Sequence, residues 1–180
     1  EHYDLGNQFY SLWLDPGMTY SSAKFTHEGQ SLEEAQREKY DALCRKLKLH
    51  PGDRVLEIGC GWGGFAVHAA RNYGCRITAV TISEAQAAYA RKRVESENLT
   101  DLIEIRIEDY RHISGSFDKI VSIEILEAVG DKFHQSFFAK CAEVLTLDGL
   151  LGVQMITVPD CRYESLRKGV DWIQTRIFPG

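Results

Sequence analysis

The chain has 180 residues, of which 44% are hydrophobic and 26% are charged, and its net charge is −5. These values are typical of one globular domain with its own hydrophobic core. The negative charge argues against sequence-independent binding to nucleic acid, which needs a positive surface. Five cysteines without any C-x-x-C spacing argue against a disulfide framework or a structural zinc site, so no metal is expected. No signal peptide or apolar run of roughly 18 residues is visible, so we expect a cytoplasmic location.

Residues 1–30 are rich in aromatic side chains and precede the first strand signal, so we expect them to form a cap or lid on a domain spanning residues 31–180. Asn7 is a candidate N-cap for a short helix that carries Phe9 to Leu14. A helix that apolar must be buried or must touch lipid. Packing against the rest of the domain is the favoured interpretation, and contact with a membrane surface is the alternative.

Strand and helix signals alternate from residue 31 onward. Ser31 and Glu34 form a capping box that opens a helix reaching Leu47, and Ser83 with Gln86 in the reciprocal position opens another. The Asp148–Gly149 pair predicts a turn into the last strand. We expect strands over 54–58, 76–81, 103–108, 119–123 and 150–158, with helices over 65–72, 83–96 and about 133–145. Repeated alternation of this kind predicts an α/β fold with a mostly parallel sheet and helices on both faces.

The most informative stretch is RVLEIGCGWGGF, residues 54–65, in which a buried strand ends in four glycines within six residues. Glycine lets the backbone turn tightly and approach a ligand closely. In parallel α/β sheets, cofactors that contain adenosine bind at the carboxyl ends of the strands, beside such a turn. A nucleotide-like cofactor is therefore expected here.

Polar residues near the ends of the first three strands favour S-adenosylmethionine over NAD. Glu57 lies two residues before the first glycine, where a carboxylate can meet a cationic ligand group. The second strand ends in Thr81 and Ile82 without the acidic residue that holds the ribose in dinucleotide folds, although Thr81 and Gln86 can bond ribose hydroxyls. The third strand is followed by Asp109 and Tyr110, a carboxylate for an adenine amino group and a ring to cover the base.

The chain resembles the cyclopropane-fatty-acid and mycolic-acid cyclopropane synthases, a branch of the S-adenosylmethionine-dependent methyltransferases. The resemblance implies a Rossmann-like class I methyltransferase fold with seven strands, of which the last would be missing from this chain. The segments that carry it are HYDLGNQFYSLWLD (2–15), MTYSSA (18–23), VLEIGCGWGG (55–64), TISEAQ (81–86), EDYR (108–111), FDKIVSIEILEAVG (117–130) and DWIQTRIFPG (171–180).

The resemblance assigns cofactor contacts to residues from five segments. It places Gly59 and Gly61 against the methionine part of the cofactor, with Tyr20 and Ser21 reaching it from the N-terminal segment. It places Thr81, Ile82 and Gln86 around the ribose. It places Asp109 and Tyr110 beside the adenine, and Ile123 on the opposite side.

The resemblance also implies a bound bicarbonate that acts as a general base. Its predicted ligands are the Glu127 carboxylate, Gln154 on the fifth strand, and positions Ser22 and Ile156. Ser22 replaces a cysteine and Gln154 replaces a histidine that is frequent in the family. Glu124 stands where a small residue is common in mycolic-acid enzymes, and it is a second-rank candidate for an acid lining the site.

The implied function is the addition of a methylene unit across the double bond of an unsaturated acyl chain in a membrane phospholipid. Peripheral contact with the inner membrane surface is compatible with this function. Two other enzyme functions stay open, namely methylation of the acyl chain without ring closure and N-methylation of a small amine. A binding module that kept the cofactor fold without catalysis is the non-enzymatic alternative.

Overall fold

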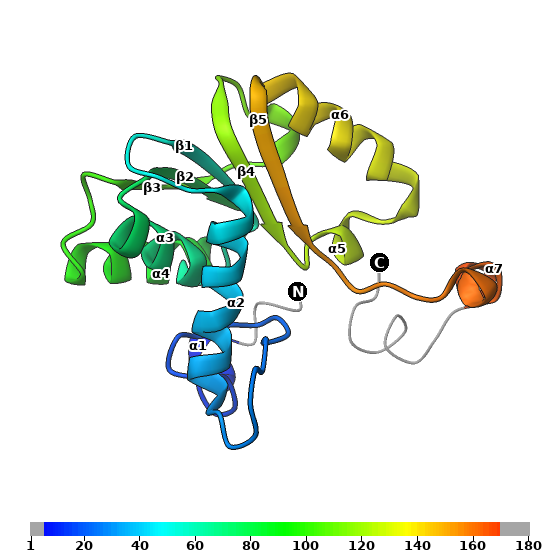
Figure 1. The fold of residues 1–180 in the computed structure, drawn as a ribbon, viewed down its shortest axis with the longest axis horizontal. Coiled ribbons are helices and arrows are strands. Elements are labelled where there is room, and N and C mark those ends of the chain that lie inside the picture. The colour runs from blue at the N-terminus through cyan, green and yellow to red at the C-terminus, as the bar shows by residue number, and fades with distance from the viewer. Residues whose placement is uncertain (1–5, 170–180) are drawn as a thin grey trace.

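The computed structural model describes residues 6–169, and its centre is a sheet of five parallel strands in the order β3-β2-β1-β4-β5 (Figure 1). The strands are β1 (Arg54–Ile58), β2 (Arg76–Thr81), β3 (Ile103–Ile107), β4 (Phe117–Ile123) and β5 (Leu145–Gln154). The helices are α1 (Asn7–Tyr10), α2 (Leu32–Leu47), α3 (Gly64–Tyr73), α4 (Glu84–Ser96), α5 (Leu126–Val129), α6 (His134–Val144) and α7 (Asp160–Lys168), with 3₁₀ turns η2 (Tyr110–His112) and η3 (Asp131–Phe133).

Helices cover both faces of the sheet, as the sequence predicted. Alternate side chains of β1 point to opposite faces. Val55 joins a buried cluster with side chains of α2, α3 and α4, whereas Leu56 and Ile58 pack with Phe137 of α6. In Figure 1, α2, α3 and α4 accordingly lie on one side of the strands and α6 on the other. The central strand β1 is therefore buried on both sides, which explains why its sequence is a continuous apolar run interrupted by a single acid.

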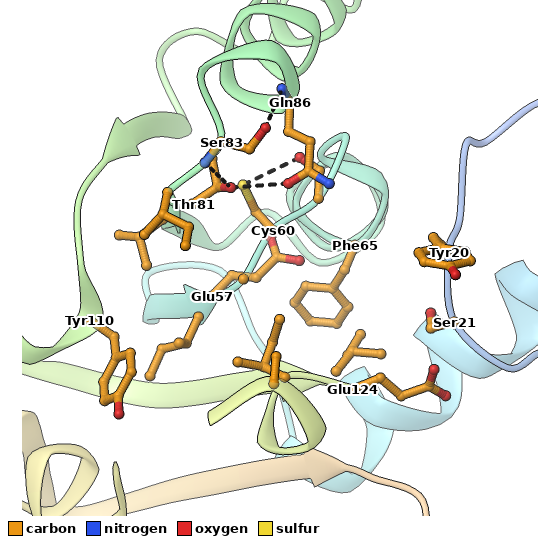
Figure 2. A pocket seen from close by; sticks show the side chains of 18 of the residues that line it. Tyr20, Ser21, Glu57, Cys60, Phe65, Thr81, Ser83, Gln86, Tyr110 and Glu124 are labelled. Atoms are coloured by element: carbon orange, nitrogen blue, oxygen red, sulfur yellow. Dashed lines mark hydrogen bonds between the residues drawn. The ribbon is translucent and has the colours of Figure 1, made fainter. Parts of the chain in front are cut away.

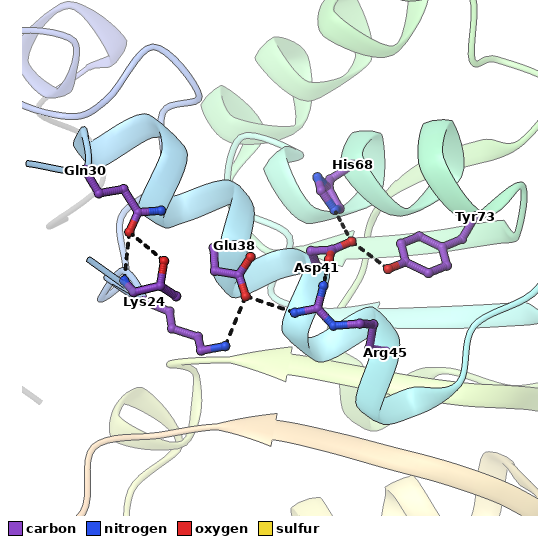
Figure 3. A network of polar contacts seen from close by, with 8 residues as sticks. Lys24, Gln30, Glu38, Asp41, Arg45, His68 and Tyr73 are labelled. Carbon is purple, nitrogen blue, oxygen red and sulfur yellow. Dashed lines mark hydrogen bonds and ion pairs between the residues drawn. The ribbon is translucent and has the colours of Figure 1, made fainter. Parts of the chain in front are cut away.

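Helix α2 is fixed at its start by the predicted capping box, since the Ser31 hydroxyl accepts from the Glu34 amide and the Glu34 carboxylate accepts from the Ser31 amide. Polar contacts join its outer face to neighbouring segments (Figure 3). Tyr73 of α3 donates to Asp41 at 2.6 Å, and Lys24 of the N-terminal segment donates to Glu38 at 3.1 Å. Helix α2 thus holds the N-terminal segment and α3 together.

The predicted start of the fifth strand was wrong. Strand β5 begins at Leu145, directly after α6, and continues through Asp148 and Gly149 instead of turning there. Its pairing with β4 is irregular near Phe117, and a Cβ on Gly149 would lie 3.0 Å from the Asp118 carbonyl oxygen. The glycine therefore serves close approach of two strand backbones at an irregularity, a second common use of this residue. The strand also ends at Gln154, earlier than predicted.

Two predicted helix caps also differ in the structure. The N-cap of α1 is Gly6, and the Asn7 side chain instead accepts a hydrogen bond from the Trp62 indole N–H at 2.7 Å. At α4, Ser83 accepts from the Gln86 amide as predicted, but the Gln86 side chain turns away to Thr81. In both positions a partner outside the helix, Trp62 for Asn7 and Thr81 for Gln86, takes the side chain that the local pattern assigned to the helix end.

The aromatic N-terminal segment is partly buried. Tyr10 and Met18 form a small core with Trp62, which follows β1. Phe9, Leu12 and Trp13 remain 43%, 81% and 48% exposed. Within residues 6–169, no helix is long and apolar enough to cross a membrane. Residues 1–5 and 170–180, which include part of the 2–15 segment and the whole 171–180 segment of the resemblance, lie outside the described residues.

Candidate functional site

A cavity of about 390 Å³ lies at the carboxyl ends of β1, β2 and β4 (Figure 2). The N-terminal segment supplies one wall through Met18, Thr19, Tyr20 and Ser21. All eleven predicted cofactor residues line this cavity, although they come from five separate parts of the chain: Tyr20, Ser21, Glu57, Gly59, Gly61, Thr81, Ile82, Gln86, Asp109, Tyr110 and Ile123. Their contacts with a cofactor stay predictions, but the fold does bring them together.

The glycine-rich turn needs glycine for two different reasons. Gly59 has φ +80°, and a Cβ there would lie 2.1 Å from Cδ1 of Ile125, so the turn packs directly on the segment that follows β4. Gly61 has φ +52° and no atom within 4 Å of its Cβ position, which leaves open space on the cavity wall. One glycine therefore allows close packing, and the other keeps the cavity clear for a ligand.

Glu57 is the most unusual group of the cavity wall because it is a carboxyl that is only 3% exposed. Burial raises its pKa to about 8, against the opposing effects of a hydrogen bond from the Ala66 amide and the charges of Arg93 and Lys39. Its Oε2 atom is buried and has no hydrogen-bond partner among the described residues. An unsatisfied buried carboxyl oxygen is costly, so this atom is suited to receive a donor from a ligand.

The opposite end of the cavity carries the groups predicted to hold ribose and adenine. The Thr81 hydroxyl donates to Gln86 Oε1 at 3.1 Å and accepts from the Ser83 amide at 3.1 Å, which fixes all three polar groups at the end of β2 (Figure 2). Hydrogen bonds from Arg111 lower the pKa of Asp109 to about 2, so this carboxylate is charged at neutral pH. The Tyr110 ring packs edge-on against Phe137, with 5.3 Å between centroids.

Two buried polar residues of α2 were not singled out from the sequence. Lys39 Nζ donates to the Ser21 hydroxyl at 2.6 Å, and Gln36 donates to the Ser21 carbonyl at 2.8 Å. Both side chains are 3% exposed, and burial lowers the Lys39 pKa to about 8. A signal was present, because Gln36 and Tyr40 are four residues apart on the buried face of an amphipathic helix. These residues hold Ser21 at the cavity wall.

The four predicted bicarbonate ligands do not form a single cluster. Ser22 and Gln154 meet, but the group between them is the carboxylate of Glu124. Glu127 instead accepts a hydrogen bond from the Ile156 amide at 2.6 Å. Glu124 lines the cavity, whereas Ser22, Glu127, Gln154 and Ile156 are not among its lining residues. The structure therefore places Glu124, the second-rank candidate, at the cavity. Glu127, the acid predicted to bind bicarbonate, is instead hydrogen-bonded to the chain after β5.

The residues present fit S-adenosylmethionine. Its cationic amine suits the unpartnered Glu57 oxygen, its hydroxyls suit Thr81 and Gln86, and its adenine suits Asp109 and Tyr110. The glycine turn leaves room at Gly61 for the methionine part of the cofactor. Within residues 6–169, no group of three or more His, Cys, Asp or Glu side chains could hold a metal ion.

The parallel sheet order and the glycine-lined cavity at its carboxyl edge are those of Rossmann-like folds, and the comparisons place the chain in one class of them, the class I S-adenosylmethionine-dependent methyltransferases. Within this class, the chain belongs to the family described as mycolic acid cyclopropane synthetase, which matches residues 1–180. The resemblance inferred from the sequence is thereby confirmed.

Two curated relatives show the range of names within this family. The chain is 40% identical to a probable fatty acid methyltransferase of Pseudomonas putida over 99% of its length and 46% of that protein. It is 41% identical to the cyclopropane-fatty-acyl-phospholipid synthase of Escherichia coli (strain K12), over 99% of its length and 44% of that protein. The chain thus spans less than half the length of these relatives.

A solved relative of the same family contains SAH. The mycolic acid cyclopropane synthase CmaA1, complexed with SAH and CTAB, superposes with a TM-score of 0.90 at 31% identity. The match covers 99% of this chain and 66% of that one. The class I fold that the resemblance implied is therefore confirmed by the sheet topology and by this comparison.

Proposed function

We propose that the protein binds S-adenosylmethionine in this cavity and transfers its methyl group to the double bond of an unsaturated acyl chain in a phospholipid. The observation that carries the proposal is the unpartnered, buried Glu57 oxygen in a cavity whose wall is open at Gly61, in a chain of this family. Together they offer a counter-charge and space for the methionine part of a sulfonium cofactor.

An alkene is a weak nucleophile, so the protein must hold it against the donor and keep water away. S-Adenosylmethionine supplies an electrophilic methyl group when it is bound. The alkene π electrons form the new carbon–carbon bond as the methyl–sulfur bond breaks, which leaves that electron pair on sulfur and a positive charge on the acyl chain. A base must then remove a proton, and the broken C–H bond decides the product.

We propose ring closure, because the family and the E. coli relative carry cyclopropane synthesis in their names. Loss of a proton from the transferred methyl group closes a cyclopropane. Loss of a proton from a neighbouring chain carbon gives a branched alkene, which corresponds to methylation without ring closure. Because both products gain the same mass, the positions of label and unsaturation must be measured.

The test uses the full-length protein with S-adenosylmethionine deuterated in its methyl group and vesicles of an unsaturated phospholipid. A cyclopropane retains two of the three deuterons, resists ozonolysis and shows ring protons by NMR. A methyl-branched alkene that retains all three deuterons would favour methylation without ring closure. Label found only in a small amine supplied alongside the vesicles would identify an N-methyltransferase. No label in either substrate, with the cofactor bound, would contradict the proposed activity.

A further inference from the structure

Three hydrogen-bond donors converge on a single oxygen of Glu124. The Ser22 amide lies 2.9 Å from Oε1, the Ser22 hydroxyl lies 2.5 Å from it, and Gln154 Nε2 lies 2.9 Å from it. These donors come from the N-terminal segment and from the end of β5, and Gln154 Nε2 also lies 3.2 Å from the Ser22 hydroxyl oxygen. Short hydrogen bonds from several donors are typical of an ionised carboxylate that is held in one orientation.

Two of these residues, Ser22 and Gln154, are positions that the resemblance assigned to bicarbonate. Bicarbonate and a glutamate side chain both present a planar carboxylate, so one donor set can hold either but not both at once. In this chain a protein carboxylate takes the donors. Glu127 is occupied elsewhere by the Ile156 amide.

The backbone at Glu124 is in the left-handed region, with φ +52°. Non-glycine residues rarely adopt this conformation, and such residues cluster at functional sites when the surrounding structure holds them there. Here the Glu124 amide donates to the Gln154 carbonyl at 2.8 Å, which fixes the backbone while the side chain reaches the three donors. The strained turn after β4 thus directs the carboxylate to the cavity wall.

The second oxygen, Oε2, receives no hydrogen bond from any residue in the range 6–169. Glu124 lines the same cavity as Tyr20 (Figure 2). Gly61 is another residue of this lining. Its charge also acts on two neighbours, because it raises the pKa of Tyr20 in addition to the effect of burial and partly offsets the lowering of the Lys39 pKa by burial. One oxygen is therefore anchored and the other is available to take a proton.

We infer that Glu124 is the built-in proton acceptor of this enzyme and replaces bicarbonate in that role. The inference rests on the proposed function, because it concerns the acyl cation formed by methyl transfer. A C–H bond of the transferred methyl group breaks, its electron pair closes the ring, and its proton moves to Oε2 of Glu124. The neutral acid later returns the proton to water, so no external anion is consumed or required.

The test begins with the wild-type protein in buffers depleted of carbon dioxide. We expect product formation at an undiminished rate, and a rate that rises severalfold with added bicarbonate would overturn the inference. If the wild-type protein makes no product under any condition, the proposed function fails instead. The two failures are therefore distinguishable.

Two variants of Glu124 then test the side chain itself. Glu124→Gln keeps the shape but cannot accept the proton, and we expect the rate to fall by roughly 10²- to 10⁴-fold. Glu124→Gly suits the φ of +52° and empties the anion position, so it guards against misfolding of the first variant. Both should bind S-adenosylhomocysteine within a few-fold of wild type by calorimetry. Glu127→Gln is the matched control, and it should lose far less activity.

Rescue and anion binding separate a base from a merely structural acid. We expect bicarbonate or acetate to restore much of the activity of Glu124→Gly, and [¹³C]bicarbonate to show saturation-transfer NMR contact with this variant but not with wild type. A Glu124→Gly protein that is fully active without an added anion would overturn the inference. So would a variant that binds S-adenosylhomocysteine normally but is revived by neither anion.

Discussion

Lys39 Nζ donates a hydrogen bond to the Ser21 hydroxyl across 2.6 Å, and both residues lie where helix α2 meets the N-terminal segment. The lysine is 3% exposed although it carries a long charged side chain. This contact holds a cavity-lining residue from a segment that lies outside the sheet. Removal of the amine should therefore act on the cavity from a distance.

We expect Lys39→Met to weaken binding of S-adenosylhomocysteine by about tenfold, since one hydrogen bond to a charged group contributes about 1.5 kcal/mol. The Ser21 backbone would remain bound by Gln36, so the effect should be partial. Isothermal titration calorimetry measures it. Lys46→Met, an exposed position on the same helix, is the control and should change nothing. Equal affinities for both variants would show that the lysine does not support the cavity.

The buried carboxyl of Glu57 predicts a dependence of stability on pH. Its pKa is about 8 in the folded protein, whereas the ordinary value of 4.5 applies to the unfolded chain. Between pH 4.5 and pH 8 the folded state therefore holds more protons than the unfolded state. Stability should therefore fall as pH rises through this window, by up to about 1.4 kcal/mol per pH unit. Urea unfolding from pH 6.5 to pH 8 measures this slope, because below that range His68, whose pKa is lowered by burial to about 4, makes stability rise with pH. Glu57→Gln should flatten it, and an unchanged slope in that variant would assign the effect to another group.

The same group predicts release of a proton on cofactor binding. At pH 7 the free protein holds Glu57 mainly neutral because its pKa is about 8. A cationic amine beside Oε2 favours the charged carboxylate, so binding of S-adenosylmethionine should expel close to one proton. Calorimetry in buffers with different ionisation enthalpies counts it. Glu57→Gln should show no such release, and a wild-type protein without proton release would place the amine elsewhere.

The two glycines of the turn should respond differently to alanine. Gly59→Ala combines a strained φ of +80° with a clash against Ile125 and should destabilise the protein by about 3 kcal/mol. Gly61→Ala has room for its methyl group and should lose only about 1 kcal/mol. The added methyl group projects into the cavity, however. The Gly61→Ala variant should therefore lose more free energy of S-adenosylhomocysteine binding than free energy of unfolding. Denaturant melts together with calorimetry separate the two effects, and similar melts would contradict the packing argument.

Membrane contact by the N-terminal segment can be tested at Leu12. This side chain is 81% exposed, whereas Trp13 also packs against Tyr20 with 5.3 Å between ring centroids. Leu12→Ser should therefore weaken co-sedimentation with phospholipid vesicles by severalfold without disturbing the fold, because an apolar side chain leaves the lipid interface. Leu147→Ser, which alters a fully exposed side chain of β5, is the control. Equal sedimentation of both variants would argue against membrane contact by the segment that follows α1.

Local pattern was sufficient for much of the fold. The apolar run at 54–58, the capping box at Ser31 and the glycines after Ile58 predicted strand β1, helix α2 and the cofactor turn. The strand and helix alternation then predicted a parallel sheet, which the order of the five strands confirms. These features depend on neighbours within a few residues, so the sequence displays their physical causes directly.

Errors arose where a side chain or a glycine had a partner outside its own helix or turn. Gly149 marks an irregularity beside Asp118 and not a turn, and Gln86 bonds Thr81 instead of completing a cap. Neither outcome could be read from spacing, because the partner atoms belong to another strand or to the other side of a loop. Lys39 and Gln36 were missed although the helical spacing indicated the buried face, because their partner Ser21 lies in another segment of the chain.

The sequence by itself determined the family, the parallel sheet and the set of residues around the cavity, because motifs of adjacent residues encode them. Only the tertiary structure decided which acid meets Ser22 and Gln154. Glu124 and Glu127 are three residues apart, and both are plausible by spacing. The left-handed backbone after β4 sends Glu124 to those donors and leaves Glu127 to the Ile156 amide. Such a choice depends on side-chain direction in three dimensions, which a linear pattern does not contain.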